Sequence, residues 1–584
     1  MSWLQTSLGC VGQHPAIAPA VSAIFVSAWV SAVAIASLGC QWLADRHAYG
    51  SHTRVQIAGA VGLCVAIATW AATEVALQSL PRLIVYFGSA AKAVPTEDEE
   101  SEHAVPKGAD LEAAAAQATV VGRAVEGAAA PKKLSKVSMN GSDNGFLPAA
   151  LGPLRAGAEL AAIMAFVYLC DRTEVFSKET KVYDPPSFWG LWLVICIVAL
   201  FTVQKLESTK PLQREQTDEW KGWMQLMFLM YHYFAEKEVY NAIRVYIACY
   251  VWMTGYGNFC LYGRKDAFSM KRTLHVLFRL NLLGTVTCII LTNEYMLYYI
   301  CAMHTIFTLF VMAALYVKRE LNNSTRCVYV KIVVLFVLTA VLYDGPEVIF
   351  KAVFGTLPII RPLAAFHDPL HPEFTNEMHE WHFRSGLDRF IWIVGMIMAL
   401  HVEHFTAFIA WLEDHPLPQR LSYSVGVLMA VLVVGGLWWQ NVFMLHKYDY
   451  NKCHPYTSAL PIACFLLLRN CVPFLRQRYL YFFAFLGKYT LETYIFQFHI
   501  WMRTTGLNGS PKFLLVWIPG HYWANFALLS VVYLGISVRF FKLTAVLSES
   551  LVRKEPKEQG VVLACAACCW ALCYSMAQLF EIGA

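Results

Sequence analysis

Three ionisable residues stand at helical spacing beside an otherwise apolar run of the chain. Asp218 and Lys221 are three residues apart, and His232 follows Lys221 by eleven. Eleven residues span about three turns of an α-helix, roughly 16 Å, so the three side chains share one helix face. A neutral imidazole at that depth can take a proton from a hydroxyl nucleophile, and a lysine near the helix start can meet an anionic donor.

Ionisable groups inside a membrane are costly and usually mark a substrate or proton path, so this spacing indicates chemistry carried out within a bilayer. The same spacing can also arise for purely structural reasons. The lysine could extend its ammonium from a helix end to the membrane surface, and the histidine could be hydrogen-bonded inside a helical bundle.

A second polar cluster crosses the boundary of a predicted span. It consists of Asn293, Glu294, Tyr295, Tyr298, Tyr299, Cys301 and His304. Glu294 is expected to face the lumen, whereas His304 falls inside the span. An interfacial belt of aromatic residues would explain the tyrosines but not that histidine.

A third cluster is rich in histidine and acidic residues. It consists of His367, Asp368, His371, His379, Glu380, Trp381, His382, Arg384, Asp388 and Arg389. Histidines three residues apart can hold a metal, and His401 and His404 form another such pair. The order matches neither the zinc-protease motif nor the histidine boxes of membrane di-iron oxygenases. We therefore expect no metal, and instead hydrogen bonds to a polar luminal acceptor.

A fourth cluster lies late in the chain, in a run with the length of a membrane span. Its polar members include Lys488, Glu492, Gln497 and His499. Glu492 and His499 are seven residues apart, so they would share a helix face. A polar cluster satisfied between helices would give the same pattern.

The composition indicates a membrane protein. Hydrophobic residues make up 57% of the chain and charged residues 15%, and apolar runs near the ~20 residues needed to cross a bilayer recur along it. A net charge of +5 is too small and too dispersed to indicate nucleic-acid binding. Most of the 17 cysteines are interpreted as small apolar residues, because many lie inside apolar runs.

The predicted fold is all-α, a polytopic transmembrane helical bundle of about 13 to 15 spans of ~20 residues. The predicted spans cover residues 16–42, 55–80, 154–171, 187–204, 221–238, 240–262, 273–292, 295–317, 328–350, 387–412, 421–445, 457–475, 480–503, 521–541 and 559–581. Arg244, Gly255, Gly257 and Asn258 make the 240–262 span the weakest, and it could instead be a broken or re-entrant helix.

Four segments are predicted. Residues 1–80 are N-terminal transmembrane helices, 81–152 a disordered cytosolic insert, 153–545 the catalytic core, and 546–584 a basic loop with a last transmembrane helix. The insert is assigned to disorder because its acidic cluster and alanine-rich stretch offer little apolar surface to bury.

Alternate loops differ in their content of lysine and arginine. The richer set holds Lys205, Lys210, Arg214, Lys221, Arg264, Lys265, Lys271, Arg272, Lys318, Arg319, Arg326, Arg476, Arg478, Arg553, Lys554 and Lys557. Positive loops stay in the cytosol, so the N-terminus is predicted to be cytosolic and the C-terminus luminal. The loop 351–385 then lies in the lumen.

Several sequence blocks carry a family resemblance that covers about residues 185–545. They are the residues 219–225, 231–233, 240–245, 252–259, 293–301, 379–389 and 497–501. In this order they closely resemble the reduced wall acetylation proteins of plants, within the wider family of fungal capsule and animal sialate O-acetyltransferases. The spacing of Asp218, Lys221 and His232 also resembles the broader acyltransferase-3 group, which implies an acyltransferase-3-like core.

The resemblance implies a multi-pass Golgi membrane enzyme that takes acetyl from cytosolic acetyl-CoA. Acetyl-CoA would be its co-substrate, and hydroxyls of a luminal cell-wall polysaccharide would be the acceptors. Fungal and animal members carry a luminal SGNH hydrolase-like domain, but this chain has no Gly-Asp-Ser block. Transfer would therefore be direct, or would pass through a separate SGNH-type acetyltransferase as a partner.

Roles for individual residues follow from the resemblance together with the clusters above. The predicted catalytic residues are His232, Glu294 and His499. The predicted donor-binding residues are Lys221, Asn241, Arg244, Arg272 and Arg279. The predicted acceptor-binding residues are His379, Glu380, Trp381, His382, Arg384, Asp388 and Gln497. Lys221 stands where the broader group has an arginine, which keeps the charge but loses the bidentate fork.

Two other functions would use the same residues. A transporter for the acetyl donor or another small anion could line its pathway with them. A scaffold that organises luminal transferases would need no chemistry of its own, so replacing His232 would do no harm.

Overall fold

A computed structural model describes residues 146–206, 210–263, 268–358, 360–373, 375–553, 555–564 and 568. The predicted spans 16–42 and 55–80, most of the span 559–581, and the insert up to residue 145 lie outside the described residues. Residues 146–152, the predicted end of the insert, instead belong to the first described helix.

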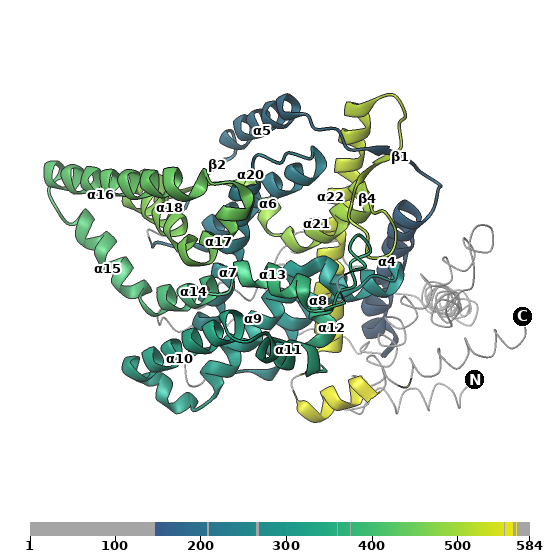
Figure 1. The fold of residues 1–584 in the computed structure, drawn as a ribbon, viewed down its shortest axis with the longest axis horizontal. Coiled ribbons are helices and arrows are strands. Elements are labelled where there is room, and N and C mark those ends of the chain that lie inside the picture. The colour runs from purple at the N-terminus through teal and green to yellow at the C-terminus, as the bar shows by residue number, and fades with distance from the viewer. Residues whose placement is uncertain are drawn as a thin grey trace, which may run out of the picture.

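The described chain is mainly helical, as expected (Figure 1). The helices of its first half are α4 Phe146–Arg172, α5 Pro185–Leu200, α6 Arg214–Tyr233, α7 Tyr240–Tyr262, α8 Met270–Leu291, η2 Tyr295–Tyr298, α9 Tyr299–Tyr316, η3 Arg319–Asn323, α10 Thr325–Asp344, α11 Glu347–Thr356 and α12 Arg361–Ala364. Those of its second half are α13 His379–Leu387, α14 Ile391–Leu400, α15 Val402–Glu413, α16 Leu417–Trp438, η4 Trp439–Phe443, α17 Lys447–Thr457, α18 Ala459–Cys471, α19 Pro473–Arg476, α20 Tyr481–Gly487, α21 Thr490–Phe496, η5 Gln497–Trp501 and α22 Tyr522–Leu551.

Two small antiparallel sheets depart from the all-α prediction. The three-stranded sheet has the order β1 (Ser177–Thr180), β5 (Phe513–Val516) and β4 (Met502–Arg503). The two-stranded sheet joins β2 (Val203–Lys205) to β3 (Arg478–Leu480). The strands are two to four residues long and lie between helices. The alternation of apolar and polar residues that indicates a strand is therefore too short to recognise in the sequence.

Each predicted span between residues 154 and 541 coincides with a helix or a set of consecutive helices, but by length and apolar composition fewer qualify as spans. Among the described residues five helices are long and apolar enough to cross a membrane: α8, the unit η2–α9, α10, α16 with η4, and α22. The unit from α13 to α15 could be a sixth, bent by 59° after Leu400. The prediction of 13 to 15 spans took α5 and α18 as full spans, whereas they have 16 and 13 residues.

The 240–262 segment is not broken. It forms the continuous helix α7, whose Arg244 and Asn258 are buried against neighbouring helices rather than facing lipid. The break lies instead in the predicted span 480–503, which divides into α20, α21 and the π-helical turn η5. In that span a π turn follows directly after α21, so residues on either side of Phe496 do not keep one helix face.

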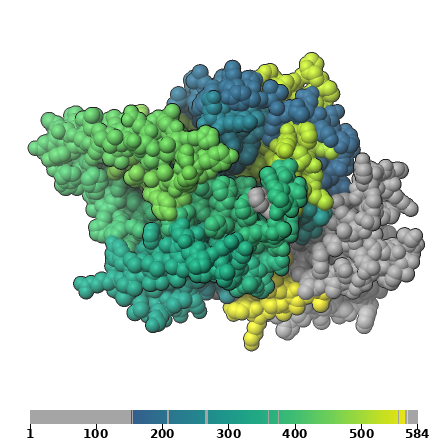
Figure 2. Space-filling view, in the orientation of Figure 1, coloured from purple at the N-terminus to yellow at the C-terminus, as the bar shows by residue number. Residues whose placement is uncertain are grey.

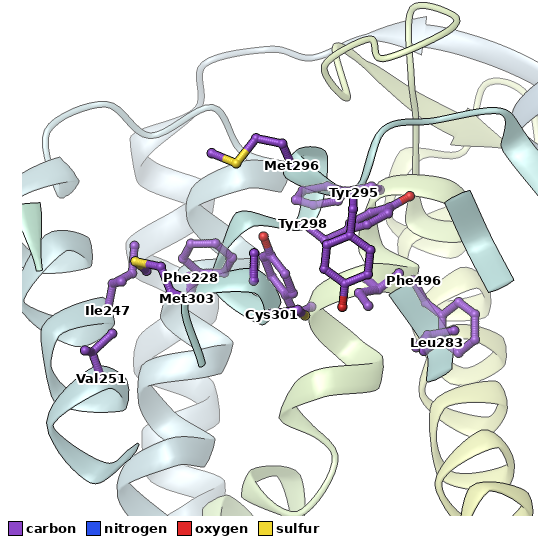
Figure 3. Close-up of a cluster of buried hydrophobic side chains, with 14 of the residues drawn as sticks. Phe228, Ile247, Val251, Leu283, Tyr295, Met296, Tyr298, Cys301, Met303 and Phe496 are labelled. Carbon is purple, nitrogen blue, oxygen red and sulfur yellow. The ribbon is translucent and has the colours of Figure 1, made fainter. Parts of the chain in front are cut away.

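The helices α6 and α7, which carry most of the candidate site, lie inside the bundle. α6 packs along α20 and α7 along α14, and the apolar core cluster surrounds both (Figure 3). Apolar side chains of α16 such as Leu432, Val433 and Leu437 are exposed on a part of the molecule that projects from one side (Figures 1 and 2). This surface suits lipid, whereas the charged residues of α6 and α7 are shielded from it.

Glycines allow the two central helices to approach their neighbours at backbone distance. A Cβ at Gly222 in α6 would lie 1.8 Å from the carbonyl oxygen of Phe483, and one at Gly487 equally close to that of Asp218. In the second pair, a Cβ at Gly255 of α7 would lie 1.8 Å from the carbonyl oxygen of Trp392. Small residues at such contacts are how membrane helices pack closely.

Replacing Gly255 by alanine should therefore force α7 and α14 apart. We expect destabilisation by about 1–3 kcal/mol, the usual effect of overpacking a core, seen as a lower unfolding temperature of the purified protein in detergent. Gly426→Ala in α16 is the matched control, because its added methyl would meet nothing within 4 Å. Equal unfolding temperatures for the two variants would contradict the packing described here.

Candidate active site

Helix α6 places the first cluster as the spacing predicts. Lys221 Nζ lies 2.6 Å from Asp218 Oδ1, and Arg214 is 3.8 Å from the same carboxylate. The helix then runs without interruption to His232 in its last turn. The hydroxyl of Tyr250 donates to the carbonyl of Lys221 at 2.6 Å, which fixes α7 against this end of α6.

A cavity of about 240 Å³ opens beside the first half of α6, and we call it the Lys221 cavity. Its lining residues are Thr217, Lys221, Gln225, Phe228, Tyr246, Ile247, Tyr250, Met253, Thr254, Asn258, Val276, Leu280, Ile300, Cys301, His304, Thr308, Thr490, Leu491 and Tyr494. His304 Nδ1 is 2.6 Å from Thr254 Oγ1, and Asn258 donates to Thr308 at 2.9 Å. The cavity is mainly apolar with a cation at its edge.

A second cavity of about 240 Å³ lies beside the last turns of α6, and we call it the His232 cavity. Its lining residues are Phe228, Tyr231, His232, Tyr240, Ile243, Arg244, Ile247, Met296, Leu297, Tyr299, Phe366, Glu380, Phe383, Arg384, Tyr494, Phe498, Ser510 and Pro511. It is bounded mainly by aromatic rings and two arginines.

The two cavities share part of their wall. Phe228, Ile247 and Tyr494 line both of them. Phe228 and Ile247 belong to the buried apolar cluster shown in Figure 3. The cavities therefore follow one another along α6, with a partition about one side chain thick between them.

His232 faces its cavity with both ring nitrogens uncommitted. Its ring centroid is 4.6 Å from that of Phe228 and 5.8 Å from that of Phe498, both in edge contacts. Its backbone carbonyl accepts a hydrogen bond from Lys181 Nζ at 2.8 Å. Within the described part of the chain, the imidazole nitrogens make no hydrogen bond. The aromatic rings fix the imidazole without using its lone pair, so it can act as a base toward a group in the cavity.

The charges of the His232 cavity are paired. Arg244 Nη2 is 2.9 Å from Asp388 Oδ2, and both groups are buried. Arg384 Nε is 2.8 Å from Glu380 Oε2, and its guanidinium lies 4.6 Å from the ring centroid of Tyr299. Paired charges and aromatic faces together suit a neutral, hydroxyl-rich ligand.

Of the five residues predicted to bind the donor, only Lys221 lines the Lys221 cavity. Arg244 lines the His232 cavity instead, and Asn241 donates to the carbonyl oxygens of Phe443 and Leu445 at 2.7 and 3.0 Å. The prediction assigned both residues of α7 to donor binding, but α7 begins at the same level as the end of α6, because the two helices are antiparallel neighbours.

The other two predicted donor ligands are also away from this cavity. Arg279 Nη1 is 2.5 Å from Glu492 Oε1, and its guanidinium lies 4.7 Å from the ring centroid of Phe541. Arg272 is exposed in the first turn of α8. The Arg279–Glu492 pair also explains why an acid stands in α21: it balances a cation of α8.

The structure places His499 outside both cavities. Its Nε2 lies 2.6 Å from the hydroxyl of Tyr298, and its Nδ1 lies 3.2 Å from Asp171 Oδ2. Asp171 also accepts from Thr504, and all of this network is buried. The partners of both ring nitrogens join η5 to α4 and η2, and the predicted catalytic role of His499 stays a prediction.

Glu294 precedes η2 and lines neither cavity, but it contacts the segment before α13 next to Met296 and Phe366, which do line the His232 cavity. Its Oε1 is 2.5 Å from His367 Nδ1, and its Oε2 accepts the backbone N–H of His367 at 2.6 Å. The hydrogen bond and the negative charge of Glu294 raise the pKa of His367. Glu294 thus holds this segment beside the His232 cavity, and its predicted catalytic role stays a prediction.

The predicted acceptor residues separate into two groups. Glu380 and Arg384 line the His232 cavity, and Asp388 lies behind it as the partner of Arg244. The others point elsewhere: Trp381 and Gln497 are fully buried, and His379 and His382 are exposed. Within α13 the two groups lie on different faces, because residues four apart share a face whereas adjacent ones do not.

Sequence reasoning missed the residues of the partition. Phe228 lies seven residues after Lys221 and four before His232, so the helical repeat already placed it on the same face. For Ile247, Tyr494 and Lys181 no comparable signal exists, because their place depends on how α7, α21 and the β1–α5 loop pack against α6.

Comparison with known proteins defines the class. Residues 111–563 match the family described as "10 TM Acyl Transferase domain found in Cas1p", and this chain belongs to that family of multi-pass membrane proteins. Its similarity extends to a curated relative, N-acetylneuraminate (7)9-O-acetyltransferase of Danio rerio, which is 32% identical over 427 residues. The matched segment covers 70% of this chain and 52% of the relative, so the chain spans about half of that protein. No solved structure gives a significant match.

The Glu294–His367 contact should make stability depend on pH. The raised pKa of His367 means that its contribution is fully present below the ordinary histidine pKa of about 6.5, and is lost as the pH rises through the raised value. Glu294→Gln should therefore lower the unfolding temperature more at pH 6 than at pH 9. His367→Gln should remove that difference, and an effect of Glu294→Gln that is independent of pH would contradict the ion pair.

Proposed function

We propose that this chain is a membrane O-acetyltransferase that moves acetyl from acetyl-CoA in the Lys221 cavity to a carbohydrate hydroxyl in the His232 cavity. The observation that carries the proposal is the pair of cavities along α6, one with a cation and one with an uncommitted imidazole, divided by one layer of side chains. Family membership and the activity named for the Danio rerio relative support the reaction type.

His232 would act as the general base. One imidazole nitrogen takes the proton of the acceptor hydroxyl as its oxygen attacks the acetyl carbonyl at the partition. When the carbon–sulfur bond breaks, the imidazolium returns that proton to the leaving thiolate, so that the free thiol of coenzyme A and the O-acetyl ester are the products. The apolar rings around His232 keep water from competing with the acceptor.

Lys221 would contact the anionic part of the donor. Its ammonium is one-quarter exposed and already touches Asp218, so it presents its remaining donors to the cavity from a fixed position. Roughly 16 Å of helix separates it from His232, which leaves room for a long flexible carrier arm between the anion and the thioester. The apolar lining between them suits such an arm.

For the acceptor we propose a sugar unit of a polysaccharide, with the His232 cavity opening to the lumen of the Golgi. Aromatic residues such as Tyr231, Tyr240 and Tyr299 can stack on sugar faces, and the Glu380–Arg384 pair can bond sugar hydroxyls. A plant cell-wall polysaccharide is the acceptor we favour, reached directly or through a separate SGNH-type transferase. In this orientation the N-terminus is cytosolic and the C-terminus luminal.

A carrier that moves an anion across the membrane would also use two cavities with a thin partition, and this is the second candidate function. The carrier and the enzyme differ in what they release. An enzyme converts acetyl-CoA to coenzyme A in the presence of an acceptor, whereas a carrier delivers the intact donor to the far side of a sealed vesicle.

His232→Gln should lower acetyl transfer by about 10²- to 10⁴-fold, the range for loss of a general base, and leave the KM for acetyl-CoA unchanged. The measurement is thiol release by purified protein with an oligosaccharide acceptor. His415→Gln is the matched control, since this histidine bonds the carbonyl of Trp411 and lines neither cavity. Full activity of His232→Gln, or vesicle uptake of intact acetyl-CoA, would refute the enzyme mechanism.

Lys221→Met should raise the KM for acetyl-CoA by roughly 10- to 100-fold, the loss of one hydrogen bond to a charged group, with a smaller change in kcat. Because the variant also leaves Asp218 without its nearest cation, Lys221→Met with Asp218→Asn serves to balance the charge. We expect weak donor binding to persist in the double variant and to recover in Lys221→Arg. Restored binding in the double variant would show that Lys221 acts only by neutralising Asp218.

A further inference from the structure

The partition between the two cavities contains one polar group. Two of its residues, Phe228 and Ile247, are apolar, and the third is Tyr494, which is 4% exposed. The Tyr494 hydroxyl is buried and has no hydrogen-bond acceptor among the described residues. The N–H of Ile300 lies near the phenol oxygen, but an N–H can only donate. The phenol proton of Tyr494 therefore remains uncommitted.

Several nearby hydroxyls have partners. Tyr250 donates to the carbonyl of Lys221 at 2.6 Å, Tyr298 bonds His499 at 2.6 Å, and Thr493 donates to the carbonyl of Tyr489 at 2.9 Å. Burying a hydroxyl without a partner costs about 1–3 kcal/mol. Tyr233, Tyr256 and Tyr343 also have buried hydroxyls without a partner among the described residues, but of these four tyrosines only Tyr494 lines the two cavities. Its position allows a bound molecule to supply the acceptor.

Tyr494 and His232 face the same small region. Phe228 contacts both, with its ring centroid 5.9 Å from Tyr494 and 4.6 Å from His232. Phe498 contacts both as well, at 5.5 Å from Tyr494 and 5.8 Å from His232. The phenol and the imidazole are thus held by the same two rings, and both line the His232 cavity.

We propose that Tyr494 is a catalytic residue that donates a hydrogen bond to the acetyl carbonyl oxygen at the partition. The inference rests on the proposed acetyl transfer. As the acceptor oxygen attacks and His232 takes its proton, the carbonyl π pair moves onto oxygen, and the phenol O–H stabilises that negative charge. The C=O bond then re-forms, the carbon–sulfur bond breaks, and His232 returns the proton to sulfur. Tyr494 keeps its own proton throughout.

Other charged donors near the partition are less suited to this role. Arg384 is paired with Glu380 and Arg244 with Asp388. Lys221 lies roughly three helical turns from His232, too far to reach a carbonyl at the partition. Of the three described residues that line both cavities, Phe228, Ile247 and Tyr494, Tyr494 alone has a hydrogen-bond donor in its side chain.

Tyr494→Phe removes the hydroxyl and keeps the ring that separates the cavities. We expect kcat for acetyl transfer to fall by about 10²- to 10³-fold, as on loss of one oxyanion donor, with the KM for acetyl-CoA unchanged. The matched control is Tyr343→Phe in α10, because Tyr343 is also buried with an unpartnered hydroxyl but lines neither cavity. Tyr343→Phe should keep the wild-type kcat.

A second measurement does not depend on turnover. A ketone analogue of acetyl-CoA, with CH₂ in place of the thioester sulfur and a ¹³C-labelled carbonyl, should bind wild-type protein with its carbonyl stretch at lower frequency than in Tyr494→Phe. Identical frequencies in the two proteins, or a wild-type kcat for Tyr494→Phe while His232→Gln is inactive, would overturn the role of Tyr494 alone. Activity in His232→Gln would instead overturn the proposed function on which this inference rests.

Discussion

A base that works inside a membrane must be surrounded by polar groups that are already satisfied, and this constraint shapes the site. An uncommitted imidazole would be bonded by any nearby cation or hydroxyl that lacked a partner. Around His232 each arginine faces its own carboxylate, and aromatic and aliphatic side chains make up most of the remaining wall. The imidazole is available to a substrate, because the described part of the chain offers it no partner.

The same constraint explains which helices lie at the centre. α6 and α7 carry the charges of the site and are shielded by other helices, whereas α16 exposes apolar side chains along its length. By length and apolar composition α16 therefore qualifies as a membrane span, whereas α6 and α7 do not. Under the proposed function, these less hydrophobic helices carry the candidate site.

The sequence predicted the geometry of α6 better than the contacts around it. The spacing of Lys221 and His232 needs only one straight helix, and α6 is one. His499 and Arg279 line neither cavity, because each is bound by a residue distant in sequence, Asp171 for His499 and Glu492 for Arg279. Such pairings depend on helix packing, which a single sequence does not specify. The broken segment 480–503 was missed for the same reason, since its apolar composition resembles that of a continuous span.

Under the proposed function, the close packing of α6 has a consequence for which donors are used. Lys221 and His232 stand on this one continuous helix, and Gly222 lets it contact α20 at backbone distance, so the separation between lysine and histidine is rigid. A rigid separation would select donors by the distance between their anionic group and their thioester. A thioester without the nucleotide would lack its anchor, and a carrier arm of another length would place the thioester carbonyl out of register with the imidazole. Selection for the coenzyme A carrier would then follow from the spacing of two residues along α6.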